Sequence, residues 1–248
     1  MYAKAKAFSL VELLVVLGII AALMAILLPL LEKGRERAND AKCMSNLRTI
    51  GQMLSLYANE NHGNYPRTMY VPGAPPAAGT NPSAADPFVS GGPVANDVTA
   101  ALFLLVRTQK IPMETFACPY NDVTTWEPDV AADPTGRSNF TNFRKNLAYS
   151  YANPYPDKSA ADGGFGLKSN MTAAFPIAAD INPGTGGNEN STNHEDRGQN
   201  VLFADGHVQW ETSPLVGIDK DNIYTTRGGA VAASPVDAQD AVLLPAQK

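Results

Sequence analysis

Residues 8–31 read FSLVELLVVLGIIAALMAILLPLL, and this stretch decides how the rest of the chain is interpreted. Only Ser9 and Glu12 are polar among its 24 residues. An apolar helix of about 20 residues crosses the hydrocarbon core of a bilayer, so length and composition predict a membrane-spanning helix. The sequence holds no second run of this kind, and we therefore expect everything after Leu31 on one side of the membrane.

Glu12 is the anomaly of this segment. A carboxylate at the centre of an apolar helix costs roughly 2.5–3.5 kcal/mol on insertion scales, and less near the interface. A helix that serves only as a membrane anchor does not require such a residue. An ionisable side chain in a membrane helix is by default a functional hypothesis, and it requires a partner.

The flanking residues argue against a cleaved secretory signal. Residues 1–7, MYAKAKA, carry two lysines and no acid, which is also typical of the start of a signal peptide. However, the apolar run is longer than the roughly 7–15 apolar residues of a signal peptide. Residues 32–37, EKGRER, also stand where a small-residue cleavage site would be. Basic residues flank the run on both sides, so charge alone does not decide the orientation.

Residues 7–14, AFSLVELL, resemble the processing site of type IV pilins and type II secretion pseudopilins. In that family a short basic leader is removed before an aromatic residue, which is then N-methylated. The resemblance implies that a prepilin peptidase cuts between Ala7 and Phe8 and that Phe8 is methylated. Ala7 departs from the glycine that the family usually has before the cut.

The resemblance also supplies a partner for Glu12. Cleavage creates a positive amine on Phe8, and in filaments of this family the glutamate of one subunit neutralises the amine of a neighbour. Charges buried in a low-dielectric environment persist only when they are paired. The resemblance therefore implies that Glu12 acts in subunit assembly.

Composition excludes some classes of function and leaves the redox state of the cysteines open. The net charge is −5 and no basic stripe is present, so nucleic acid is not an expected partner. Abundant glycine and proline indicate a loop-rich exported domain. Cys43 and Cys118 fit one disulfide in an oxidising compartment, or two free thiols. Cys43 shares a predicted helix face with Leu47, and that face packs on the domain containing Cys118, which favours the disulfide.

The resemblance implies a pilin-like α+β fold, and the residue pattern beyond the apolar run agrees with a long N-terminal helix packed on a small antiparallel sheet. Apolar residues from Cys43 to Tyr57 recur at spacings of three and four, which continues the helix to about residue 59. Pro29 and Gly34 are expected to break or bend it. The predicted parts are a leader (1–7), a membrane or filament-core helix (8–31), its amphipathic continuation (32–60), a globular periplasmic α+β domain (61–226) and a mobile tail (227–248).

Turn-forming residues and apolar runs predict the elements of the globular domain. Residues 71–96 are rich in proline, glycine, alanine and serine and are expected to form an irregular surface loop. Residues 98–110 predict a short buried helix with Asp97 as its N-cap. Strands are expected at 147–151, at 175–179, and at 200–204 and 207–210.

Two details of these strands can be checked directly. Pro176 would confine its strand to a sheet edge, because proline cannot donate a hydrogen bond to a neighbouring strand. Asp205-Gly206 between two apolar runs predicts a hairpin with a two-residue turn, because such a turn needs positive φ.

The C-terminal part carries a second resemblance. His194, ten residues and then Asp205-Gly206 resemble the H-x9-DG element of pilin-like proteins, with a spacer one residue longer. We expect structural roles, with His194 bonding backbone in its loop and Asp205 serving the turn.

Calcium is the one cofactor that the sequence suggests. Asp219 and Asp221 are candidate ligands, because hard cations take clustered carboxylate and carbonyl oxygens. The resemblance points the same way, since major pseudopilins can carry calcium in a C-terminal loop, but the spacing lacks a full ligand set. The sequence shows no Ser-His-Asp or Cys-His arrangement and no phosphate-binding glycine loop, so an enzyme is not expected.

These observations predict a structural subunit of a type II secretion pseudopilus. Before assembly it would be held in the inner membrane by one helix, with a periplasmic C-terminal domain. The expected partners are prepilin peptidase, identical or related subunits, the secretion or pilus assembly machinery, and inner-membrane lipid. Two alternatives stay open: a type IV pilus subunit for adhesion or motility, and a membrane-tethered binding module whose loops 71–96 and 182–199 bind a ligand.

Overall fold

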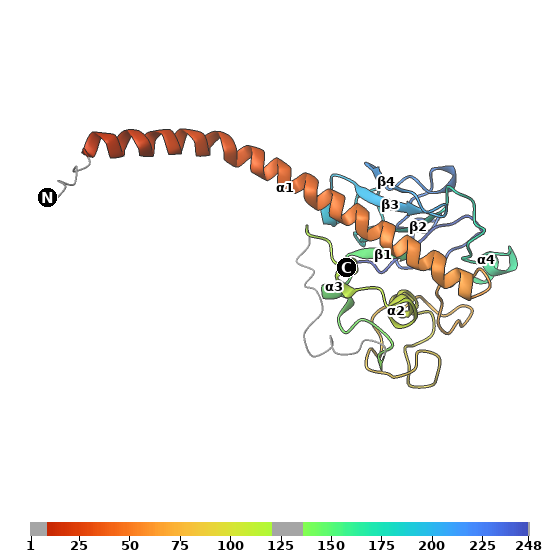
Figure 1. Ribbon diagram of the computed structural model, residues 1–248. Coiled ribbons are helices and arrows are strands. Elements are labelled where there is room, and N and C mark those ends of the chain that lie inside the picture. Colours follow the sequence, from red (N-terminus) through yellow and green to blue (C-terminus); the bar gives the residue numbers. More distant parts are fainter. Residues whose placement is uncertain (1–8, 121–135, 248) are drawn as a thin grey trace. The chain divides into compact units, whose positions relative to one another are not determined.

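The computed structural model describes residues 9–120 and 136–247 (Figure 1). A long N-terminal helix and a five-stranded antiparallel sheet confirm the predicted α+β, pilin-like class. The helices are α1 (Leu10–Glu60), α2 (Val98–Gln109), α3 (Phe143–Asn146) and α4 (Lys158–Asp162), with 3-10 helices η1 (Met113–Phe116), η4 (Thr192–His194) and η5 (Ile218–Lys220). The strands are β1 (Tyr149–Ala152), β2 (Pro176–Asp180), β3 (Gln199–Phe203), β4 (Val208–Glu211) and β5 (Leu243–Leu244).

Helix α1 is continuous from Leu10 to Glu60, so the predicted break at Pro29 or Gly34 is wrong, while the alternative of a bend there stays a prediction. A proline in a helix interior removes one backbone hydrogen bond, and here the strong helix formers around it keep the helical conformation. The chain divides into two compact units inside this helix, Met1–Ala41 and Lys42–Lys248. The globular unit thus begins within α1, earlier than the predicted boundary at residue 61, because the side chains that α1 buries start at Cys43.

In the globular unit, the second part of α1 lies across the sheet (Figure 1). Its buried side chains follow the predicted spacing and are Cys43, Asn46, Leu47, Ile50, Gly51, Leu54, Tyr57 and Ala58. Gly51 permits the closest approach. A Cβ atom at Gly51 would lie 2.9 Å from Cδ1 of Leu202 on β3, so the helix packs directly on this strand.

The sheet has the order β4-β3-β2-β1-β5, and all neighbouring strands are antiparallel. β2 therefore lies in the middle, and the prediction that Pro176 confines it to an edge is wrong. Pro176 is the first residue of β2, and the pairing with β3 shifts register between Pro176 and Ala178. A first residue next to an irregularity need not donate to the ladder, so proline is tolerated there.

The β3–β4 hairpin is present, but its turn differs from the predicted one. Phe203 N donates to His207 O at 3.0 Å, and Gly206 N donates to Phe203 O at 2.9 Å. The connection therefore has three residues, and within it only Gly206 has a positive φ, of 87°. A three-residue turn also needs a residue with positive φ at its last position, and Gly206 fills that position.

Part of the predicted mobile tail at 227–248 packs on the sheet, so the prediction is wrong for residues 241–246. β5 pairs with β1, with Tyr151 opposite Leu244. Residues 241–244 are buried, and Asn153 N donates to Val242 O at 2.8 Å. An apolar AVLL run inside a proline- and alanine-rich segment supplies enough burial to add this edge strand.

The remaining predictions for the globular unit agree with the structure. Helix α2 starts after Asp97, whose Oδ1 accepts a hydrogen bond from Ala100 N at 2.9 Å. Residues 71–96 form neither helix nor strand, and Asn96 holds the start of this loop through hydrogen bonds with the N and O atoms of Val71. Strand β1 begins two residues later than predicted.

Candidate functional site

The first half of α1 is the part of the chain most different from a soluble domain. Every residue from 9 to 38 is exposed, although most of these residues are apolar. Among the described residues, α1 is the one helix long and apolar enough to cross a membrane. No described residue of the same unit buries its apolar side chains, so lipid or another protein is needed to shield them from water.

Glu12 forms a local contact at the beginning of this helix. Its Oε2 accepts a hydrogen bond from Ser9 N at 2.9 Å, while Ser9 Oγ accepts one from Val11 N at 3.3 Å. The Glu12 bond is one half of a capping box, and Ser9 Oγ caps the second helical N–H in place of the third, so two backbone N–H groups without a partner in the helix are satisfied. In the single chain, Glu12 therefore stabilises the start of α1, where the helix dipole also favours a negative charge.

The predicted processing site lies outside the described residues. Ala7 and Phe8 are both in this category, so cleavage between them and methylation of Phe8 stay predictions. The described chain begins next to this site, and Ser9 and Glu12 show that the helix starts immediately after it.

The residues of the C-terminal element do not form one site. Asp205 and Gly206 lie at the exposed tip of the β3–β4 hairpin, where Asp205 Oδ1 accepts a hydrogen bond from His207 N at 3.0 Å and also contacts His207 Nδ1. The hydrogen bond from His207 N, followed by the contact with the His207 ring, lowers the pKa of the Asp205 carboxyl. Asp205 thus serves the turn, whereas His194 is buried in η4 and contacts a different carboxylate.

His194 pairs with Asp180, at the end of β2. The two atoms, His194 Nε2 and Asp180 Oδ2, are 3.0 Å apart, and both side chains are completely buried. The imidazole ring lies between Tyr120 and Trp210, with ring centroids 4.7 and 5.0 Å away.

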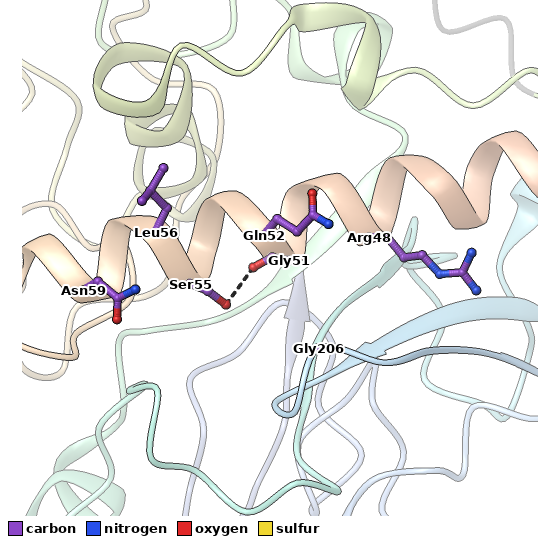
Figure 2. Close-up of a pocket in the computed structure, with 7 residues that line it drawn as sticks. All are labelled: Arg48, Gly51, Gln52, Ser55, Leu56, Asn59 and Gly206. Carbon is purple, nitrogen blue, oxygen red and sulfur yellow. Dashed lines mark hydrogen bonds between the residues drawn. The ribbon is translucent and has the colours of Figure 1, made fainter.

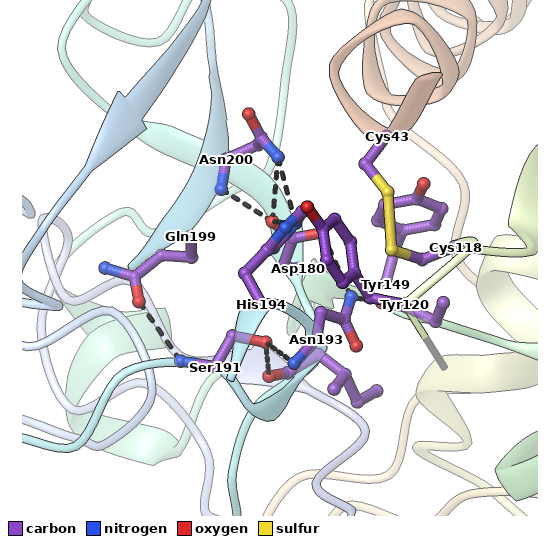
Figure 3. A network of polar contacts seen from close by, with 12 residues as sticks. Cys43, Cys118, Tyr120, Tyr149, Asp180, Ser191, Asn193, His194, Gln199 and Asn200 are labelled. Carbon is purple, nitrogen blue, oxygen red and sulfur yellow. Dashed lines mark hydrogen bonds and ion pairs between the residues drawn. A yellow bond between two sulfur atoms is a disulfide. The ribbon is translucent and has the colours of Figure 1, made fainter. Parts of the chain in front are cut away.

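Asp180 is the centre of a buried hydrogen-bond network that links three strands (Figure 3). Its Oδ2 accepts hydrogen bonds from the backbone N and from Nδ2 of Asn200 on β3, at 2.6 and 3.0 Å. Its Oδ1 accepts one from Nδ2 of Asn193 at 3.0 Å, and the same amide reaches Ala148 O before β1. Such bonds compensate the loss of hydration of a buried carboxylate.

The charge of Asp180 affects the phenols around it. Burial raises the pKa of the Tyr149 hydroxyl, and the nearby Asp180 carboxylate raises it further. Burial, followed by the Asp180 carboxylate, also raises the pKa of the Tyr224 hydroxyl. This hydroxyl donates a hydrogen bond to Asp180 O at 2.9 Å. Both hydroxyls therefore stay protonated at physiological pH.

Cys43 and Cys118, the pair named from the sequence, are joined by a disulfide with a Cα–Cα distance of 5.5 Å. The bond links α1 to the segment after η1. One ligand atom from each of Cys43, Cys118, Asp180 and His194 lies within 4.8 Å of the others, and all four residues are buried. Asp180 was not identified from the sequence, where it is one acidic residue at the end of a predicted strand.

A groove of about 410 Å³ lies between α1 and the tip of the β3–β4 hairpin (Figure 2). Its lining residues are Arg48, Gly51, Gln52, Ser55, Leu56, Asn59 and Gly206. Ser55 Oγ donates to Gly51 O at 3.0 Å, so this hydroxyl is engaged by the helix itself. Among the lining residues only Arg48 is charged, so the groove lacks the paired acid and base that hydrolytic chemistry uses.

The two residues proposed for calcium lie around Arg227. Its guanidinium nitrogens are 3.6 Å from Asp219 Oδ2 and 3.8 Å from Asp221 Oδ2, and 3.1 Å from Asp237 Oδ2. Burial, followed by the neighbouring Asp240, raises the pKa of Asp221 from 3.8 to about 7. A calcium role for Asp219 and Asp221 stays a prediction.

Comparison with known proteins identifies the N-terminal segment. The family described as the prokaryotic N-terminal methylation motif matches residues 2–28. The chain is 41% identical over 59 residues to the Type IV wide pilus major component PilA4 of Thermus thermophilus. That alignment covers 24% of this chain and 45% of the relative, so it spans a little under half of the relative's length. No solved structure matches the chain.

Proposed function

We propose, from the premise that this chain is type IV pilin-like at its N-terminus, that the protein is a structural filament subunit and not an enzyme. The observation that carries the proposal is the exposed apolar half of α1 with the single carboxylate of Glu12 at its start. A methylation motif, an apolar helix without an internal partner and one acidic side chain together fit a helix that packs against copies of itself.

The proposed cycle begins in the inner membrane, where residues 8–31 span the bilayer and the globular unit lies in the periplasm. Prepilin peptidase removes residues 1–7, and methylation of Phe8 follows. The helix then leaves lipid and packs against the same segment of other subunits. Repeated head-to-tail contacts of this kind generate open helical filaments.

Glu12 would hold the register between neighbouring subunits. Its carboxylate accepts one hydrogen bond from Ser9 N in the single chain. An ionised carboxylate has several acceptor positions, so it can keep this bond while it pairs with the Phe8 ammonium of a neighbour. Because both charges would lie in an apolar filament core, displacement of one subunit would leave two unpaired charges and be disfavoured.

The type of filament is the finer part of the proposal. We favour a type II secretion pseudopilus that assists the export of proteins through the secretion machinery. A type IV pilus subunit is the second candidate, and similarity to a type IV wide pilus component supports it. Deletion of the gene separates the two, because the first predicts retention of exported proteins in the periplasm and the second predicts loss of surface fibres.

The experiment that tests processing is the intact mass and N-terminal sequence of the protein recovered from its native membrane. The expected chain starts at N-methylated Phe8. An Ala7→Gly variant, which has the usual residue of the family before the cut, is the matched control and should be processed at least as completely. A chain that still starts at Met1 in cells with active prepilin peptidase would contradict the proposal and favour a membrane-tethered binding module.

A further inference from the structure

The disulfide, Asp180 and His194 form a cluster that a filament subunit does not require (Figure 3). We propose that Cys43, Cys118, Asp180 and His194 form a redox-controlled site for Zn²⁺, which is closed when the cysteines are joined by the disulfide and open when they are reduced. The inference is independent of filament assembly, because all four residues belong to the globular unit.

The ligand types and their spacing fit zinc. Tetrahedral zinc sites use cysteine sulfur at about 2.3 Å, histidine nitrogen at about 2.0–2.1 Å and carboxylate oxygen at about 2.0–2.2 Å. Donor atoms at these distances lie roughly 3.3–3.8 Å from one another. The four candidate donors already lie within 4.8 Å of each other, so small side-chain movements would bring them to the required positions.

The pair formed by His194 and Asp180 has the geometry that zinc needs. The two atoms lie 3.0 Å apart and face the same point, and in the loaded site the imidazole would bind zinc through the lone pair of Nε2 and keep its proton on Nδ1. Asn200 and Asn193 orient the carboxylate through three hydrogen bonds. Hydrogen bonds of this kind to metal ligands fix their orientation and strengthen binding.

Zinc binding would add no net charge to the buried cluster. The thiolate is the form of cysteine that binds metal, so each of the two thiols loses its proton when zinc binds. Zn²⁺ thus displaces two thiol protons, and its two positive charges are matched by the two thiolate charges. The usual penalty for an uncompensated buried charge therefore does not oppose the metal.

The redox step balances with a dithiol reductant. The reductant donates two electrons and two protons, the S–S bond breaks, and the reductant leaves as its own disulfide. The two cysteine thiols then lose their protons to solvent as zinc binds. The sulfur atoms separate from the roughly 2.0 Å of a disulfide to roughly 3.8 Å in the metal site. The disulfide excludes zinc because the thiolate is the form that binds metal.

The test uses the full-length chain in detergent micelles, reduced under anaerobic conditions and then freed of reductant. Co²⁺ replaces Zn²⁺ as a probe, because tetrahedral thiolate-bound cobalt has intense visible bands and a thiolate-to-cobalt charge-transfer band. We expect one equivalent of Co²⁺ to bind the reduced protein with both features, and Zn²⁺ to displace it. The oxidised protein should show neither band.

Asp180→Asn and Asp205→Asn provide a matched pair of carboxylate-to-amide changes, one in the cluster and one on the exposed hairpin. Asp180→Asn should weaken Zn²⁺ binding by about tenfold or more, whereas Asp205→Asn should leave it unchanged. Equal affinities in two folded variants would overturn the assignment.

Two results with the unmodified chain also decide the question if Asp180→Asn fails to fold. Reduced protein that binds no Co²⁺, or binds it without the thiolate band, would overturn the proposal. If the site exists, Zn²⁺ should also slow the re-formation of the disulfide by a thiol oxidant at least tenfold, and an unchanged rate would contradict it.

Discussion

The two halves of α1 have the same backbone structure and opposite surroundings. From residue 9 to residue 38 every side chain is exposed, although most are apolar, whereas from Cys43 to Ala58 one face is completely buried on the sheet. The buried face of the second half contacts residues of the same chain, and its polar residues, apart from the buried Asn46, lie on the other face. The first half has apolar residues all round, which no single domain could cover, and therefore indicates a partner outside the chain.

The largest expected difference between the halves is in how much a leucine-to-alanine substitution destabilises the globular unit. Leu47 is completely buried, and Leu47→Ala should lower the free energy of unfolding by about 2–5 kcal/mol, because it removes apolar contacts and leaves a cavity. Leu17 is 59% exposed, so Leu17→Ala should change this free energy by less than about 0.5 kcal/mol. Denaturant unfolding of both variants in detergent, followed by near-UV circular dichroism, measures the difference. Equal effects would contradict the division of the helix.

Glycine-to-alanine substitutions in the two halves of α1 should have smaller effects on stability, and these effects should have opposite signs. Gly51→Ala should destabilise the globular unit by about 1–3 kcal/mol, because the new Cβ would lie 2.9 Å from Leu202. Nothing lies within 4 Å of a Cβ at Gly18, so Gly18→Ala should leave the fold intact and favour the helix by up to about 1 kcal/mol. Thermal unfolding of the globular unit and helix content by far-UV circular dichroism separate the two effects. A stabilising Gly51→Ala would mean that α1 does not pack directly on β3.

Two partly buried carboxyl groups should make the stability of the globular unit depend on pH. Burial and Asp240 raise the pKa of Asp221, and burial is likewise the main cause of the raised pKa of Asp240. A raised pKa means that the folded state holds the proton more tightly than the unfolded state. The contribution of Asp221 to stability is therefore fully present below about pH 4 and is lost as the pH rises to about 7.

Asp221→Asn should remove this pH dependence, because an amide does not titrate. The free energy of unfolding between pH 4 and pH 8 measures the effect, with Asp219→Asn as the control at an exposed position near the same Arg227. A variant whose stability falls with pH as steeply as that of the unmodified chain would assign the effect to another group.

The sequence predicted correctly the features that depend on residues close together in the chain. The spacing of Cys43, Leu47 and Leu54 gave the buried face of α1, and Asp97 gave the start of α2. The placement of the strands was different, because the partner of a short strand depends on residues far away in the sequence. Pro176 suggested an edge, yet the strand it begins is central, since its position at the first residue makes the missing N–H harmless.

The residues that sequence reasoning missed are those whose role exists only in three dimensions. Leu243 and Leu244 stand in a proline- and alanine-rich segment, and only the open edge of β1 gives them a place to pair. Asp180 is one of many acidic residues in the sequence, and the fold alone brings it to His194 and the disulfide. A polar residue at the end of a buried strand, as Asp180 is, was the available signal for a buried network.

The most direct test of the account is the amount of filament assembled by a Glu12→Gln variant, measured as sheared filaments by immunoblot and electron microscopy. Glutamine keeps the size of the side chain and its ability to accept from Ser9 N, but removes the charge that pairs with the Phe8 ammonium. With cleavage and membrane levels equal to those of the unmodified protein, we predict at least a tenfold loss of filaments. Unchanged assembly would contradict the pairing of Glu12 between subunits as the function of this half of α1.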